Sequence, residues 1–145
     1  MKKILLIGLI TLCTLSANAT NLFNTLSEQD RKYVEDTIKF QQKLITCTPF
    51  EFSGSGNYLK IYGKENGKCH FVVKAGGASM QKDGAKETTA GVCDYKMPLN
   101  IAKQYANGSI KLTKAIYGLD DIKLKSGELE AISINLLNIT QQYCK

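Results

Sequence analysis

Hydrophobic side chains recur at intervals of three and four residues near the start of the chain, as on one face of an amphipathic helix. They are Leu26, Tyr33, Val34, Ile38, Leu44 and Ile45. Ser27 precedes this stretch and Asp30 follows three residues later, a variant of the capping box that begins many helices. Pro49 cannot continue a helix and favours an extended conformation at Thr48. The pattern predicts one helix over residues 27–46.

The hydrophobic period changes to two in the middle of the chain, which is typical of β-strands. Residues 58–64 and 68–75 are rich in aromatic and β-branched side chains, and Asn66-Gly67 between them favours a tight hairpin turn. A third strand is predicted over residues 87–96. In the second strand Cys69, Phe71 and Val73 share one face, which is apolar enough to be the core side, and the third strand places Cys93, Tyr95 and Met97 on one face.

Two segments beside these strands are rich in glycine and small polar residues. Ser53-Gly54-Ser55-Gly56 reads as a flexible linker, because no Gly-Lys-Ser/Thr and no helix follow it as in a phosphate-binding loop. Residues 76–84 have the composition of a mobile surface loop with Met80 near its tip. Met80 is a candidate hydrophobic contact for a partner, although a lone methionine more often folds back onto its own chain.

Helical periodicity returns after Pro98, a residue that suits the first turn of a helix. This helix is expected to end at Asn107-Gly108, whereas residues 109–125 give a mixed signal. From Ser126 onward apolar residues again recur every three or four positions and predict a last helix that carries Cys144. The predicted fold is therefore α+β, with an N-terminal helix, a three-stranded antiparallel sheet and two or three C-terminal helices.

The first 19 residues have the order of features found in a secretory signal peptide. Lys2 and Lys3 precede an apolar run, and Ala17-Asn18-Ala19 provides a cleavage motif of small residues. We expect cleavage after Ala19, which leaves residues 20–145 as a single domain without a membrane span. A lipoprotein is disfavoured because the bulky Leu12 precedes Cys13. The predicted location is the periplasm or the outside of a Gram-negative bacterium.

Four cysteines remain after removal of the signal peptide, and in an exported chain this number predicts two disulfides. Three pairings are possible. If the second and third strands pair with Ala75 near Thr88, Cys69 lies within bridging range of Cys93. Cys47 is then left for Cys144, and the expected disulfides are Cys69–Cys93 and Cys47–Cys144.

These cysteines also carry a resemblance. Cys47-Thr48-Pro49-Phe50, Gly67-Lys68-Cys69 and Cys93-Asp94-Tyr95 are similar to the motifs of a loose group of small, uncharacterised secreted bacterial proteins. The similarity covers residues 47–97. It implies export and a cysteine framework, and it implies no activity.

Charge and motifs limit the range of functions. Removal of Lys2 and Lys3 lowers the formal net charge from +6 to +4, and the remaining lysines are dispersed, which disfavours a nucleic-acid partner. His70 is the only histidine and its neighbour Cys69 points to the opposite face of the strand, so no thiolate–imidazole pair and no metal site is predicted. No Cys-x-x-Cys is present, and no cofactor is expected.

Candidate binding residues are His70, Tyr58, Lys60, Tyr62 and Met80. Tyr58, Lys60 and Tyr62 share one face of a strand, where they could bind a glycan or an anionic polymer, although such residues more often form the packing face of the sheet. We expect an exported, non-enzymatic binding or structural protein, whose partner is another protein or an anionic envelope component. The alternatives are a secreted inhibitor or host-facing factor, and a small hydrolase that uses His70 with a carboxylate.

Overall fold

The computed structural model describes residues 22–75 and 91–145. The predicted signal peptide, Met80 and the predicted loop 76–84 lie outside these residues. The described elements are, in chain order, α1 (Leu22–Thr25), α2 (Glu28–Ile45), β1 (Phe50–Gly54), β2 (Asn57–Glu65), β3 (Lys68–Ala75), β4 (Val92–Pro98), α3 (Leu99–Tyr117), the 3-10 helix η3 (Leu119–Asp121) and α4 (Ser126–Tyr143).

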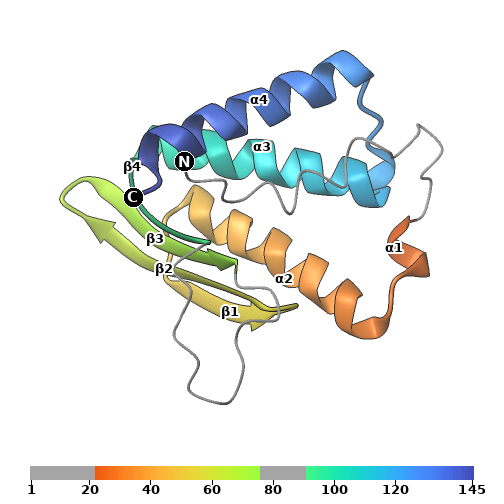
Figure 1. The fold of residues 1–145 in the computed structure, drawn as a ribbon, viewed down its shortest axis with the longest axis horizontal. Helices are drawn as coiled ribbons and strands as arrows, with labels where there is room; N and C mark the ends of the chain where they lie inside the picture. Colours follow the sequence, from red (N-terminus) through yellow and green to blue (C-terminus); the bar gives the residue numbers. More distant parts are fainter. Residues whose placement is uncertain (1–21, 76–90) are drawn as a thin grey trace.

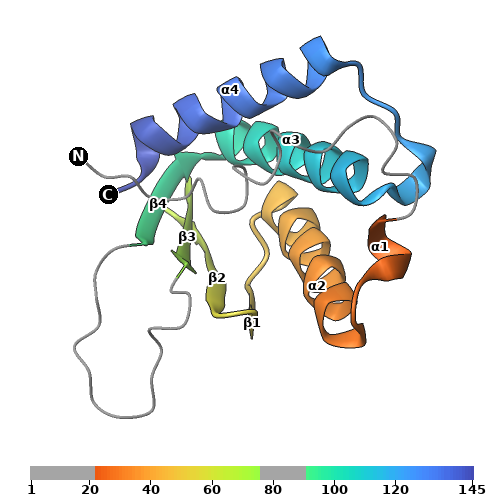
Figure 2. The same ribbon diagram turned by 45° about the vertical axis from the view of Figure 1, so that its right-hand side comes forward.

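The strands form one antiparallel sheet in the order β1-β2-β3-β4, and the helices lie together on one side of it (Figures 1 and 2). Helix α3 packs between α2 and α4, while α4 also contacts β4. This confirms the predicted α+β class, although the sheet has four strands where three were predicted. No helix within residues 22–75 and 91–145 is long and apolar enough to cross a membrane.

The additional strand, β1, ends within the segment Ser53-Gly54-Ser55-Gly56 that the sequence favoured as a linker, and the rest of that segment forms the turn into β2. Ser55 and Gly56 both have positive φ, at 49° and 78°, and form a two-residue turn that pairs Gly54 with Asn57. Two positive φ angles are what a type I′ hairpin requires. Ser-Gly is a weaker signal for this turn than Asn-Gly, so the hairpin was missed while the one at Asn66-Gly67 was predicted correctly.

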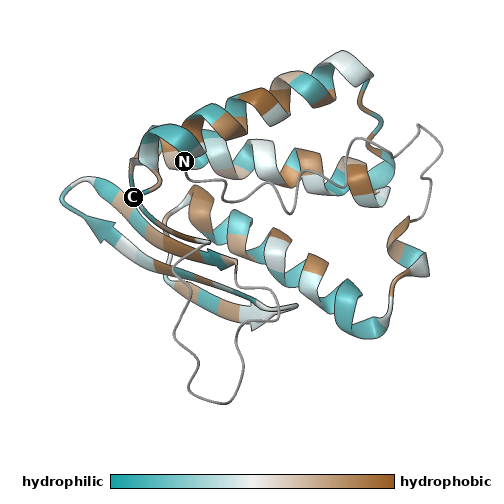
Figure 3. Ribbon diagram, viewed as in Figure 1, coloured by the Kyte–Doolittle hydropathy of each residue, from teal (hydrophilic) through white to brown (hydrophobic). Residues whose placement is uncertain are grey.

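Hydrophobic and polar residues alternate along the strands (Figure 3), and their burial separates a core face from an outer face, as the sequence predicted. Phe71, Tyr95 and Met97 are fully buried on the core face. The ring of Phe71 stacks on that of Tyr95 with centroids 4.6 Å apart. Aromatic residues from two helices, Phe40 and Tyr105, complete this cluster. Burial raises the pKa of both Tyr95 and Tyr105 above that of an exposed tyrosine.

Both disulfides differ from the predicted pairing: Cys47 bonds to Cys69, and Cys93 bonds to Cys144. The predicted bridges Cys69–Cys93 and Cys47–Cys144 are therefore wrong. The cause is the strand register, because β4 begins at Val92 rather than near residue 87 and pairs Cys69 with Met97 and Cys93 with Val73. Cys69 and Cys93 share the core face but lie at opposite ends of the β3–β4 ladder, too far apart to bond.

Helix α3 continues past the point where the sequence predicted its end. Gly108 lies inside the helix, where a Cβ atom would stand 3.2 Å from the side chain of Leu136 on α4. The glycine permits close approach of the two helices and does not end α3. Gly118, with φ of 67°, is the residue that ends the helix in the left-handed conformation. The predicted final helix is confirmed as α4, Ser126–Tyr143.

The predicted helix over residues 27–46 is confirmed as α2, and both of its ends are hydrogen-bonded. At the start, the backbone N–H of Asp30 donates to Ser27 Oγ at 3.1 Å. At the end, the N–H of Cys47 donates to the carbonyl of Leu44, and the N–H of Thr48 donates to that of Lys43. This is a Schellman motif in which Cys47 occupies the left-handed position, with φ of 53°, that glycine usually takes.

The left-handed backbone at Cys47 leads to a stability prediction in variants that lack its disulfide. In a Cys69→Ala background, the free energy of unfolding of the Cys47→Gly variant is expected to be about 1 kcal/mol higher than that of the Cys47→Ala variant. The glycine variant is more stable because only glycine adopts this conformation without a steric penalty. Urea denaturation of the two double variants measures the difference. Equal stability, or a more stable alanine variant, would show that residue 47 does not hold this conformation.

Candidate binding face of the sheet

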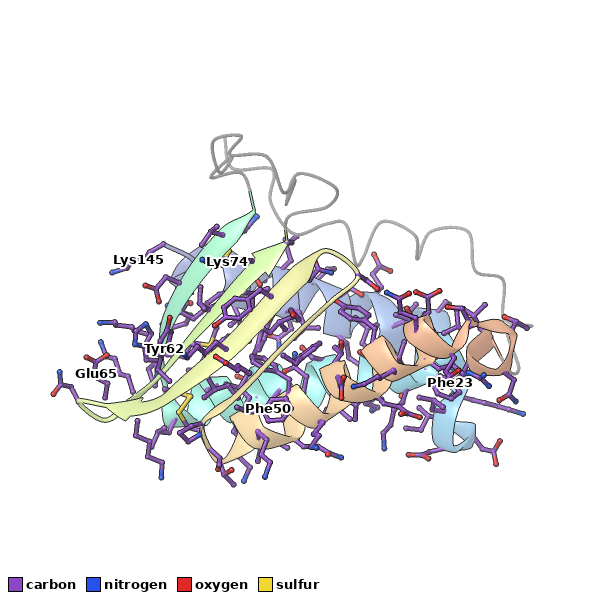
Figure 4. The ribbon with its side chains drawn as sticks, turned by 90° about the horizontal axis from the view of Figure 1, so that it is seen from below. Phe23, Phe50, Tyr62, Glu65, Lys74 and Lys145 are labelled. Atoms are coloured by element: carbon purple, nitrogen blue, oxygen red, sulfur yellow. A yellow bond between two sulfur atoms is a disulfide. The ribbon has the colours of Figure 1, made fainter. Side chains whose placement is uncertain are left out.

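The candidate residues Tyr58, Lys60 and Tyr62 lie on the outer face of the sheet, away from the helices. Their neighbours on β2, Leu59 and Ile61, are buried in the core. Figure 4 shows the sheet in front of α3 and α4, with Tyr62 and Lys74 labelled on β2 and β3. Tyr62 is 51% exposed. Of the two interpretations of this face, the structure excludes the one in which it packs the core.

A β-bulge brings Glu65 onto the same face. The pairing of β2 with β3 shifts between Ile61 and Gly63, where Gly63 has φ of 115°. A bulge adds one residue to one strand and so reverses the side on which later side chains emerge. With strict alternation, Glu65 would lie on the other face of the sheet from Tyr62. Because of the bulge, it lies on the same face, beside His70.

His70 lies at the centre of an ion-pair cluster on this face. Its Nε2 atom is 2.8 Å from Asp94 Oδ1, and its Nδ1 atom is 3.2 Å from Glu65 Oε2. Lys96 Nζ approaches the same Glu65 oxygen at 3.3 Å. Because a protonated imidazole donates through both nitrogens, it can bridge the two carboxylates and connect β2, β3 and β4.

The tyrosine rings on this face lie against the imidazole of His70 and the ammonium groups of two lysines. Tyr62 stacks on the imidazole of His70 with centroids 4.5 Å apart, and Lys60 Nζ lies 5.1 Å from the Tyr62 centroid. Lys74 Nζ lies 5.7 Å from the centroid of Tyr58. These contacts fall within the range of cation–π interactions and restrict the rotamers of both tyrosines. Each ring therefore has neighbours on the sheet face that favour its observed position.

Glu51 on β1 completes the outer face. Its Oε2 atom accepts a hydrogen bond from the Tyr58 hydroxyl at 3.1 Å and lies 3.1 Å from Lys60 Nζ. The hydrogen bond from Lys60, together with that from Tyr58, lowers the pKa of the Glu51 carboxyl. The hydrogen bond with Glu51 raises the pKa of the Lys60 ammonium group. Both groups thus remain charged at neutral pH.

The structure brings four of the five predicted binding residues together, namely Tyr58, Lys60, Tyr62 and His70. The fifth, Met80, lies outside the described residues. Sequence reasoning did not name the other charged members of this face as candidates, which are Glu51, Glu65, Lys68, Lys74, Asp94 and Lys96. Alternation along β3 and β4 could have found Lys74, Asp94 and Lys96, whereas Glu51 required recognition of β1 and Glu65 required recognition of the bulge.

The contacts of His70 are those of a structural residue that joins neighbouring strands through noncovalent interactions. Both ring nitrogens face carboxylates within 3.2 Å, so neither is directed toward a substrate position as a general base would need. Glu65 and Asp94 lie on opposite edges of the imidazole. Within residues 22–75 and 91–145, no group of three histidine, cysteine or acidic side chains converges as metal ligands.

A comparison with protein-family models, with curated proteins and with solved structures gave no match for this chain. Function is therefore inferred from the chemistry of the outer face.

Proposed function

We propose that this chain is an exported, non-enzymatic binding protein that recognises another protein through the outer face of its sheet. The observation that carries the proposal is Tyr62, a half-exposed aromatic residue held between His70 and Lys60. Binding hot spots are enriched in tyrosine, and a ring that is already fixed loses little conformational entropy on binding. Two disulfides fit a protein that folds in an oxidising compartment.

The charges on the outer face favour a protein over an anionic polymer as the partner. The acids on this face, Glu51, Glu65 and Asp94, are each paired with a basic side chain of the same face. A surface for a polyanion would present an excess of lysine or arginine. An aromatic centre within a rim of both charges is the usual anatomy of a protein–protein interface.

The proposal is tested by immobilising the processed protein and measuring by mass spectrometry what it retains from an envelope extract of its source organism. Tyr62→Ala is expected to reduce retention of the specific partner about tenfold or more, since the loss of a hot-spot tyrosine costs more than about 1 kcal/mol. Ile134→Ala is the matched control, because Ile134 is 50% exposed but lies on α4.

Two results would contradict this proposal. One is a retained protein that binds wild type and Tyr62→Ala equally but is lost in Ile134→Ala. The other is retention of an anionic polymer that disappears as salt is raised, because dispersed charge attraction is screened at high ionic strength.

A further inference from the structure

Two asparagines in this chain directly precede a glycine, and the structure places them in different backbone conformations. They are Asn66, in the turn between β2 and β3, and Asn107, inside α3. In an Asn-Gly pair the backbone nitrogen of the glycine can attack the amide carbon of the asparagine side chain, because glycine has no side chain to obstruct that approach. Both asparagines are exposed to water. A difference in their reactivity would therefore come from the backbone.

The turn at Asn66 has the rotational freedom that this reaction requires. Glu65 and Lys68 are the last paired residues of the hairpin, and Asn66 and Gly67 between them have φ of 49° and 74°, as in a type I′ turn. The hydrogen bond that closes such a turn joins the two flanking residues, so the peptide group between Asn66 and Gly67 can rotate without breaking the strand pairing. Among the described residues other than its chain neighbours, none has an atom within 4 Å of the position that a Cβ on Gly67 would take.

Rotation of this peptide group brings the reacting atoms together. It converts the type I′ turn to type II′, the other two-residue turn that fits a β-hairpin. In type I′ the nitrogen of Gly67 points away from the side chain of Asn66, whereas in type II′ it lies on the same side as the Cβ atom of Asn66. A five-membered ring that contains both atoms can then close. The hairpin is therefore compatible with the ring as well as with the unmodified asparagine.

Helix α3 opposes the same reaction at Asn107. In an α-helix the N–H of Gly108 donates to the carbonyl of Gln104, and the carbonyl of Asn107 accepts from the N–H of Lys111. Rotation of the peptide group between Asn107 and Gly108 therefore breaks helical hydrogen bonds on both of its sides. This part of α3 is also packed against α4, because a Cβ atom on Gly108 would stand 3.2 Å from the side chain of Leu136.

We propose that Asn66 is a site of spontaneous deamidation in the folded protein, with water as the only co-reactant. The nitrogen of Gly67 loses its proton and bonds to the side-chain amide carbon of Asn66. The bond from that carbon to the side-chain nitrogen breaks, and the nitrogen takes up a proton and leaves as ammonia. Water then adds to one of the two carbonyls of the ring and opens it. Opening at one carbonyl gives aspartate, and opening at the other gives isoaspartate, whose backbone runs through the former side chain.

Deamidation changes the charge of the hairpin that contributes to the ion-pair cluster of His70. Both products carry a carboxylate in place of a neutral amide, next in sequence to Glu65, which Figure 4 shows at the end of the hairpin. Glu65 Oε2 contacts both His70 Nδ1 and Lys96 Nζ. Isoaspartate also lengthens the backbone of the turn. The modification thus alters this end of the outer face whatever that face binds.

Incubation of the folded, processed protein at mildly basic pH, followed by proteolysis and mass spectrometry of the peptides, tests this modification site. Asn66 is expected to deamidate at least about tenfold faster than Asn107, because opening the interior of a packed helix costs more free energy than rotating a peptide group in an exposed turn. Isoaspartate is expected at residue 66, since only opening of the ring forms it. In concentrated urea, where both pairs are unstructured, the two rates should become similar, which is the matched control.

Equal rates at the two asparagines in the folded protein, or an absence of isoaspartate at residue 66, would overturn the proposed site. So would a folded protein in which neither asparagine reacts while both react in urea, because the turn would then lack the described rotation. The Asn66→Gln variant should lose the fast reaction, since the longer side chain of glutamine forms its ring far more slowly. Fast deamidation that persists in this variant would assign the reaction to another residue.

Discussion

Replacement of both Cys93 and Cys144 by alanine is expected to lower the free energy of unfolding by about 4 kcal/mol, the larger of the two disulfide effects. The Cys93–Cys144 bond closes a loop with a sequence separation of 51 residues, whereas Cys47–Cys69 spans 22. In the chain-entropy description, the longer loop restricts the unfolded chain more, which gives about 4 kcal/mol against about 3 kcal/mol.

Urea denaturation of the two double-alanine variants measures these losses under identical conditions. A loss of about 4 kcal/mol is a large share of the roughly 5–15 kcal/mol typical of folded domains, so the Cys93/Cys144 variant should unfold at a markedly lower urea concentration. A loss below about 1 kcal/mol, or the larger loss in the Cys47/Cys69 variant, would contradict the prediction.

Phe71→Ala is expected to destabilise the protein by about 3–5 kcal/mol, as is usual when a buried phenylalanine is truncated. Phe71 has no exposed surface, and its ring stacks on Tyr95 and contacts Phe40 and Tyr105. Its removal would leave a cavity where the sheet meets helices α2 and α3. The cost includes both lost burial of apolar surface and lost contacts around that cavity.

Tyr62→Ala is the matched control for Phe71→Ala, since Tyr62 is an aromatic residue on the opposite face of the neighbouring strand. Its truncation should cost about 1 kcal/mol or less, because half of the residue remains in water in the folded state. Thermal or urea unfolding of both variants provides the comparison. Similar stability of the two would mean that Phe71 is not at the centre of the core.

Much of the fold could be predicted because local patterns agree with the final packing. The three- and four-residue spacing before Cys47 identified α2, and the period of two identified which faces of β3 and β4 meet the core. These patterns depend on only a few neighbouring residues. The same is true of Asn66-Gly67, whose tolerance for positive φ fixes a hairpin without help from distant parts of the chain.

Apart from the weak turn signal at Ser55-Gly56, the errors concern relations between segments. The disulfide pairing was wrong because it depended on the register of β3 with β4, which shifts by several residues if β4 begins later. Gly108 was interpreted as a helix end because its contact with Leu136 on α4 leaves no local signal. On the outer face, Glu65 was missed for a similar reason, since the bulge at Gly63 depends on pairing with the neighbouring strand.

The two disulfides close loops that follow one another along the chain without overlapping. One loop joins the end of α2 to β3, and the other joins β4 to the end of α4, so each disulfide lies wholly within its own half of the chain. Only the polypeptide between Cys69 and Cys93 connects the halves covalently. A single peptide-bond cleavage there would yield two separate, internally cross-linked fragments, held together only by noncovalent contacts such as the β3–β4 ladder, the aromatic core and the packing of their helices.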